Sequence, residues 1–130
     1  MPEREAIHTD SAPAAAGPYS QAIRAGTLVF TAGQLGIDPA SGDLVDGGVG
    51  PQAERALENL RAVLEAADSG MGELVKVTVF LVDIGDWPAV NEVYARLVPE
   101  PYPARSAFAV LALPKGALVE IEAVAAVQPG

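Results

Sequence analysis

The stretch LVKVTVFLV at residues 74–82 decides the fold of this chain. Its β-branched and aromatic residues predict a strand, and both of its faces are apolar apart from Lys76 and Thr78. A strand of this composition belongs inside a sheet whose two faces are both covered. The rest of the sequence must therefore supply a layer for each face, or a second molecule must do so.

A hairpin is predicted before this strand, because residues 19–24 and 27–34 are rich in strand-forming residues and flank a glycine turn at 25–26. A helix is predicted from Pro51 to Gly70, since proline suits the first turn of a helix and glycine commonly ends one. The apolar residues of this helix recur at helical spacing, at Ala53, Ala56, Leu57, Leu60, Val63, Leu64 and Ala67.

A second helix is predicted after the strand. Asp86 is a suitable N-cap for it, and the prolines within residues 99–103 end it. Two more strands follow at residues 105–111 and 118–127. The apolar stripe of the second helix consists of Val90, Val93, Tyr94 and Leu97.

This order of elements predicts the fold class α+β, with residues 1–130 forming a single domain. The domain has a mixed β-sheet with two helices on one face. Two helices cover only one face of such a sheet, so the opposite face needs a different cover. Another copy of the chain is the simplest cover, and we expect a homo-oligomer whose sheets face inward.

Composition excludes several classes of chemistry. The absence of cysteine rules out thiolate catalysis, disulfides and cysteine-ligated metals, and the single histidine, His8, has no second ligand at metal spacing. With 17 acidic and 8 basic residues, the net charge of −9 disfavours nucleic-acid binding. The charged N-terminus is followed by no apolar segment, so we expect a cytoplasmic protein without a signal peptide or a membrane partner.

Arg105 follows a proline turn at residue 103 and opens an apolar strand. Burial of a guanidinium is unfavourable unless an anion meets it, and the planar fork of the guanidinium suits a carboxylate. Glu120 and Glu122 share one face of another apolar strand, which we expect to neighbour the first. Two interpretations remain open, namely a reaction site for a small carboxylate substrate and an internal Arg–Glu ion pair.

Three other positions are weak candidates taken alone: Tyr19 after a turn, Gly33 at the end of a strand, and Asn91 on the second helix. In this order, however, the motifs around them resemble the Rid family of reactive-imine deaminases, also called YjgF-like or L-PSP proteins. The motifs are GPYSQ at 17–21, FTAGQ at 30–34, NL at 59–60, KVTVFL at 76–81, NEVY at 91–94, PARS at 103–106, LPK at 113–115 and VEIEA at 119–123.

The resemblance implies a chorismate-mutase-like fold that forms a homotrimer, with a site at each cleft between subunits. It implies that Arg105 grips the substrate carboxylate, while Glu120 activates a water that attacks an imine carbon and releases ammonia and a 2-keto acid. No metal and no cofactor are implied. Such imines already hydrolyse slowly in water, so positioning and one base suffice. The other substrate-binding residues that the resemblance implies are Tyr19, Gly33, Asn91 and Ala107.

Two positions depart from the family pattern. Ala32 stands where many members have a serine whose hydroxyl contacts the carboxylate, and the neighbouring Thr31 is expected to point to the opposite face. Ala107 replaces a common cysteine. Two alternatives to a general imine deaminase remain open: a pathway-specific hydrolase of an aminated or carbamate metabolite, and a non-catalytic, chaperone-like trimer that binds small metabolites.

Overall fold

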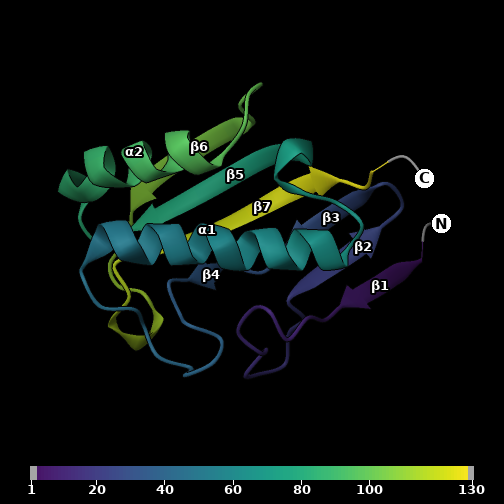
Figure 1. The fold of residues 1–130 in the computed structure, drawn as a ribbon, viewed down its shortest axis with the longest axis horizontal. Coiled ribbons are helices and arrows are strands. Elements are labelled where there is room, and N and C mark those ends of the chain that lie inside the picture. The colour runs from purple at the N-terminus through teal and green to yellow at the C-terminus, as the bar shows by residue number, and fades with distance from the viewer. Residues whose placement is uncertain (1–2, 129–130) are drawn as a thin grey trace.

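The computed structural model describes residues 3–128, and within them a single mixed sheet carries two α-helices on one face (Figure 1). The strand order is β1-β2-β3-β7-β5-β6, and the short β4 pairs with β7 beside this path. The strands are β1 (Arg4–Ile7), β2 (Ala22–Ala25), β3 (Leu28–Thr31), β4 (Gln34–Leu35), β5 (Leu74–Leu81), β6 (Ala104–Ala109) and β7 (Val119–Ala126), and the helices are α1 (Val49–Ala66) and α2 (Trp87–Leu97). The α+β class and the mixed sheet are confirmed.

Strand β5 is the interior strand predicted from residues 74–82. It pairs antiparallel with β7 on one side and parallel with β6 on the other. Alternate side chains of β5, among them Val77 and Val79, are fully buried on the side that the helices cover. The opposite face of β5 carries Lys76, Thr78 and Phe80, which are only partly covered.

Helix α1 begins at Val49, two residues before the predicted start at Pro51, and ends at Ala66 rather than at Gly70. It ends early because the chain reverses at Asp68, which has a left-handed backbone with φ of 60°. The predicted stripe of α1 is nonetheless correct, since every member of it is buried in the core. That stripe packs across β7 and against α2 (Figure 1).

The structure differs from the sequence prediction in three local details. Strand β1 was not expected, and it pairs with β2 along an edge of the sheet. The two-residue strand β4 also escaped prediction. Asp86 occupies the N-cap position of α2, but its side chain accepts no capping hydrogen bond there. Asp83 instead accepts a 2.8 Å hydrogen bond from the backbone N–H of Gly85 and caps the short 3₁₀ turn that leads into α2.

The face of the sheet away from the helices exposes large apolar side chains. Phe30 and Phe108 are each 45% exposed, and Phe108 meets Phe80 edge to face with ring centroids 5.2 Å apart. An open apolar face of this kind is typical of a surface that another molecule covers.

Across residues 3–128, neither helix combines the length and the apolar character that a membrane crossing requires.

Candidate functional site

Arg105 lies at the edge strand β6, beside a cavity of about 370 Å³ next to α2. Its guanidinium stacks between two rings, with Cζ 4.5 Å from the centroid of Trp87 and 4.7 Å from that of Tyr94. Nη1 donates a 2.9 Å hydrogen bond to Oδ1 of Asn91. The cavity is lined by Asn91, Tyr94, Ala95, Tyr102, Pro103 and Arg105. The structure therefore brings the predicted residues Arg105 and Asn91 together.

The structure decides two points about Arg105 that the sequence left open. The side chain belongs to an exposed residue, so its charge is not buried in this chain. The internal Arg–Glu ion pair is also absent, since the ion pairs found within residues 3–128 involve other arginines. Aromatic rings and a neutral amide hold the guanidinium without cancelling its charge, which leaves donors available for an anion.

Tyr94 forms the inner wall of this cavity. The residue is 2% exposed, and its buried hydroxyl has no hydrogen-bond partner among the described residues. Burial raises the pKa of the Tyr94 phenol, and the nearby charge of Arg105 offsets part of that rise. The ring therefore stays neutral at ordinary pH and meets Arg105 as an uncharged aromatic surface.

Glu120 lies on β7 and faces a second, larger cavity of about 680 Å³. Tyr19, Gly33 and Lys115 line the same cavity, so three residues predicted from the sequence, Tyr19, Gly33 and Glu120, are brought together. Gly33 packs directly on the Glu120 side chain, and a Cβ at position 33 would overlap with the carboxylate. Glycine at this position is thus a condition for the position of the carboxylate.

The surroundings of Glu120 favour its neutral form. Partial burial is the larger cause that raises the pKa of the Glu120 carboxyl, and the like charge of Glu122 raises it further. Both glutamates lie on the helix-free face of β7, as the alternation along the strand predicted. A carboxylate with a raised pKa is a stronger base than an ordinary glutamate.

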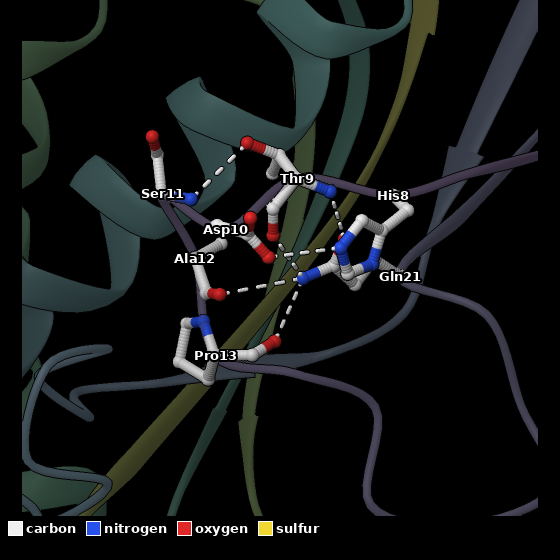
Figure 2. A network of polar contacts seen from close by, with 7 residues as sticks. All are labelled: His8, Thr9, Asp10, Ser11, Ala12, Pro13 and Gln21. Carbon is white, nitrogen blue, oxygen red and sulfur yellow. Dashed lines mark hydrogen bonds and ion pairs between the residues drawn. The ribbon is translucent and has the colours of Figure 1, made fainter.

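Gln21 organises one wall of the Glu120 cavity. The side chain is buried, and its Nε2 donates to the carbonyls of Thr9 at 3.0 Å, Pro13 at 2.8 Å and Ala12 at 3.4 Å (Figure 2). Its Oε1 accepts a 2.7 Å hydrogen bond from the Thr9 N–H. One amide thus holds the loop between β1 and β2 against the cavity, next to Tyr19. The motif GPYSQ contains this glutamine, but the sequence alone did not suggest its role.

The hydroxyl missing at Ala32 is not replaced by its neighbour. Ala32 lines the Glu120 cavity, and its N–H donates to the backbone carbonyl of Gln21. The Thr31 hydroxyl accepts a 3.0 Å hydrogen bond from the N–H of Ala123 and lies by a different hollow, on the open face of the sheet. The cavity therefore has an apolar wall at position 32, as expected.

Arg105 and Glu120 do not meet within one chain. Their strands were expected to be neighbours, and this prediction is wrong, because β5 lies between β6 and β7. Arg105 pairs with Val77 and so lies on the helix-covered face, whereas Glu120 pairs with Phe80 on the open face. They also line different cavities. A single chain therefore presents Arg105 and Glu120 on opposite faces of the sheet, each beside its own cavity.

Ala107 lines neither cavity. It pairs with Val79 of β5 and packs on the core from the edge strand β6, the outer side of which has no partner strand among residues 3–128. The residues that sequence analysis missed are Trp87 and Tyr102, together with the contact of Tyr94 to Arg105. The sequence held a signal for Trp87 and Tyr94, since both share one helix face with Asn91 at the spacing i, i+4, i+7.

Comparison with known proteins gives matches along nearly the whole chain. Residues 9–127 match the family model described as Endoribonuclease L-PSP. The RutC family protein y4sK of Sinorhizobium fredii is 52% identical over 120 residues, which cover 92% of this chain and 95% of that protein. A 2-iminobutanoate/2-iminopropanoate deaminase of Capra hircus is 51% identical over 126 residues, covering 97% of this chain and 92% of that protein.

Solved structures agree with these sequence matches. The crystal structure of RidA from an Antarctic Psychrobacter species matches with a TM-score of 0.92 and 47% identity, covering 95% of this chain and 100% of that one. The resemblance inferred from the ordered motifs is thereby confirmed, and this chain belongs to the L-PSP family, which includes the Rid and YjgF-like proteins.

Proposed function

We propose that this protein is a hydrolytic deaminase of 2-imino and 2-enamino acids, of the 2-iminopropionate and 2-aminoacrylate type. The observation that carries the proposal is the pair of complementary half-sites. One presents an arginine that no carboxylate of residues 3–128 neutralises, and the other presents a glutamate with a raised pKa. A 2-imino acid needs both, a cation for its carboxylate and a base beside its imine carbon.

The two half-sites lie on opposite faces of one sheet, so the proposed assembly is a homotrimer in which the Arg105 face of one chain meets the Glu120 face of the next. The open face with Phe30 and Phe108 supports burial between chains. Light scattering at micromolar concentration should give about three times the chain mass of 13.3 kDa. A stable monomer would contradict the assembly and the shared site together.

In the proposed reaction, Arg105 holds the substrate carboxylate through two parallel hydrogen bonds, and Asn91 keeps the fork oriented. Glu120 accepts a proton from a water as the water oxygen bonds to C2 of the imine, and it gives this proton to the imine nitrogen, which forms a neutral carbinolamine. Glu120 then takes the proton of the carbinolamine hydroxyl and passes it to the nitrogen. The C–N bond breaks as the C2 carbonyl forms, which releases ammonia and a 2-keto acid.

The direct test is ammonia release from freshly generated 2-iminopropionate, measured against the uncatalysed rate. Kinetics on a panel of imines derived from other amino acids would show which side chain the 680 Å³ cavity prefers. Binding of 2-keto acids without any acceleration of ammonia release would refute the deaminase proposal.

Co-expression of Arg105→Ala with Glu120→Gln should restore activity that neither variant has alone. Each shared site needs an intact Arg105 from one chain and an intact Glu120 from the next. In trimers that contain both variants, about one third of the sites are therefore complete. The measurement is the specific activity of mixed trimers purified through two different tags. If Arg105 and Glu120 of the same chain formed the site, the mixed trimers would stay inactive.

The pH dependence of kcat/KM should show the raised pKa of Glu120. A base must be deprotonated to act, so the acidic limb of kcat/KM should lie above the ordinary glutamate pKa of 4.5. Glu122→Gln removes one like charge and should move this limb to lower pH, with turnover at neutral pH nearly unchanged. An unmoved limb would exclude the influence of Glu122.

The same shift has a consequence for stability, with a definite sign. Folding raises the pKa of the Glu120 carboxyl, so the folded state binds the carboxyl proton more tightly than the unfolded state. The contribution of this proton to the free energy of unfolding is fully present below pH 4.5. That contribution is lost as the pH rises through the pKa of the folded state.

A further inference from the structure

Arg105 is held differently from the other arginines that make ion pairs in residues 3–128. Arg24 pairs with Glu5 and Asp68, and Arg55 pairs with Glu58. Arg105 instead lies between two aromatic rings and donates to one neutral amide. A carboxylate partner would neutralise the fork and occupy its donors. Aromatic rings accept none of the N–H donors of the fork, so the donors that do not bind Asn91 remain for a ligand carboxylate.

The three groups that hold Arg105 come from one face of α2. Trp87 is the first residue of the helix, and Asn91 and Tyr94 follow it at positions i+4 and i+7. Pro88 lies in the first turn, where its fixed φ favours the helical start that places Trp87. The helix therefore presents a preformed surface for the guanidinium, in which Tyr94 is buried and Trp87 and Asn91 are partly exposed.

We propose that Trp87 is a positioning residue for the carboxylate anchor and that its indole reports whether a carboxylate occupies the anchor. Trp87 touches Arg105 and acts through it, while Arg105 touches the ligand. The ligand class is the small 2-keto and 2-imino carboxylates, so this inference rests on the proposed function. Without the indole face, the exposed guanidinium has additional rotamers, and each productive encounter requires it to be ordered again.

Tryptophan emission from this protein comes from one residue, because Trp87 is the single tryptophan of the chain. Its ring lies 4.5 Å from a cation whose charge a bound carboxylate offsets. Indole emission responds to the local field, so occupancy of the anchor should change the emission of this one fluorophore. Arg105→Lys is the matched control, since it keeps a positive charge at position 105 but removes the planar fork.

The experiment measures Trp87 emission during titration with pyruvate, with pyruvate binding followed independently by calorimetry. We expect a saturable change whose midpoint equals the calorimetric Kd, and a weaker midpoint in Arg105→Lys. Trp87→Leu should raise KM about fivefold to tenfold with little change in kcat. Trp87→Phe, which keeps an aromatic face, should restore KM to near the original value. Circular dichroism and light scattering on each variant establish that it is folded and assembled.

The outcomes separate this inference from the proposed function. Saturable emission changes with pyruvate but no ammonia release would refute the deaminase and support the role of Trp87. The role of Trp87 would be overturned by two results in a protein that deaminates normally. These are tryptophan emission that does not respond to pyruvate and a KM that is unchanged in Trp87→Leu. If Trp87→Leu fails to assemble, the titration of the unmodified protein against Arg105→Lys decides the question alone.

Discussion

Arg105→Ala should reduce deamination to the uncatalysed background while the fold and the assembly persist. The substrate carboxylate would lose its charged, two-point partner, and binding and orientation would be lost together. We expect kcat/KM to fall on the order of a thousandfold. The melting temperature should barely change, because Arg105 is exposed and makes no ion pair with the other described residues. Ammonia release and thermal unfolding of the same preparation measure both effects.

Arg105→Lys tests the geometry of carboxylate binding separately from the charge at position 105. Lysine keeps the positive charge but presents a single point in place of a planar fork. Activity should still fall by about tenfold or more. An Arg105→Ala protein that deaminates normally would show that Arg105 is not the carboxylate anchor, and one that unfolds would show that Arg105 has a structural role.

Gly33→Ala should be nearly as damaging as loss of the base itself, although it adds only one methyl group. A Cβ at residue 33 would overlap with the carboxylate of Glu120, and the flexible Glu120 side chain must move away. A displaced base no longer orients water, so turnover should fall by about a hundredfold, the loss expected for Glu120→Gln. Initial rates at saturating substrate measure this, and Arg105 should still bind pyruvate with its original affinity.

Gly36→Ala is the matched control for the added methyl group. A Cβ at residue 36 would overlap with the backbone of Gln52 on α1. A helix backbone cannot move aside as the flexible side chain of Glu120 can. This variant should therefore lose thermal stability, whereas Gly33→Ala keeps its melting temperature. A Gly33→Ala protein with full turnover would show that the contact with Glu120 is unimportant for catalysis.

Elements with a strong local pattern were predictable from the sequence. The buried strand β5 follows from a run of β-branched and aromatic residues, and the stripe of α1 follows from helical periodicity. Neighbouring residues establish both patterns without reference to the rest of the chain. Strand β1 was not predictable in this way. Its sequence, REAI, has three exposed residues and one buried residue, and it is a strand because it pairs with β2, far along the chain.

Residue types and motif order indicated Arg105 and Glu120 as site candidates, but their arrangement in space was not predictable. Alternation along a single strand correctly placed Glu120 and Glu122 on one face. Alternation cannot relate faces on different strands, which depends on the parallel pairing of β6 and the antiparallel pairing of β7 with β5. The separation of Arg105 from Glu120 onto opposite faces therefore emerged only in three dimensions.

That separation makes the proposed catalysis a property of the population of chains. In the proposed mechanism a single chain cannot deaminate its substrate, because its Arg105 and Glu120 lie beside different cavities. Activity per chain should then decline on dilution below the concentration at which chains associate, and it should return on concentration. The proposed contact is also directional, since each chain would place its Arg105 face against one neighbour and its Glu120 face against the other, and only a closed ring would complete every site.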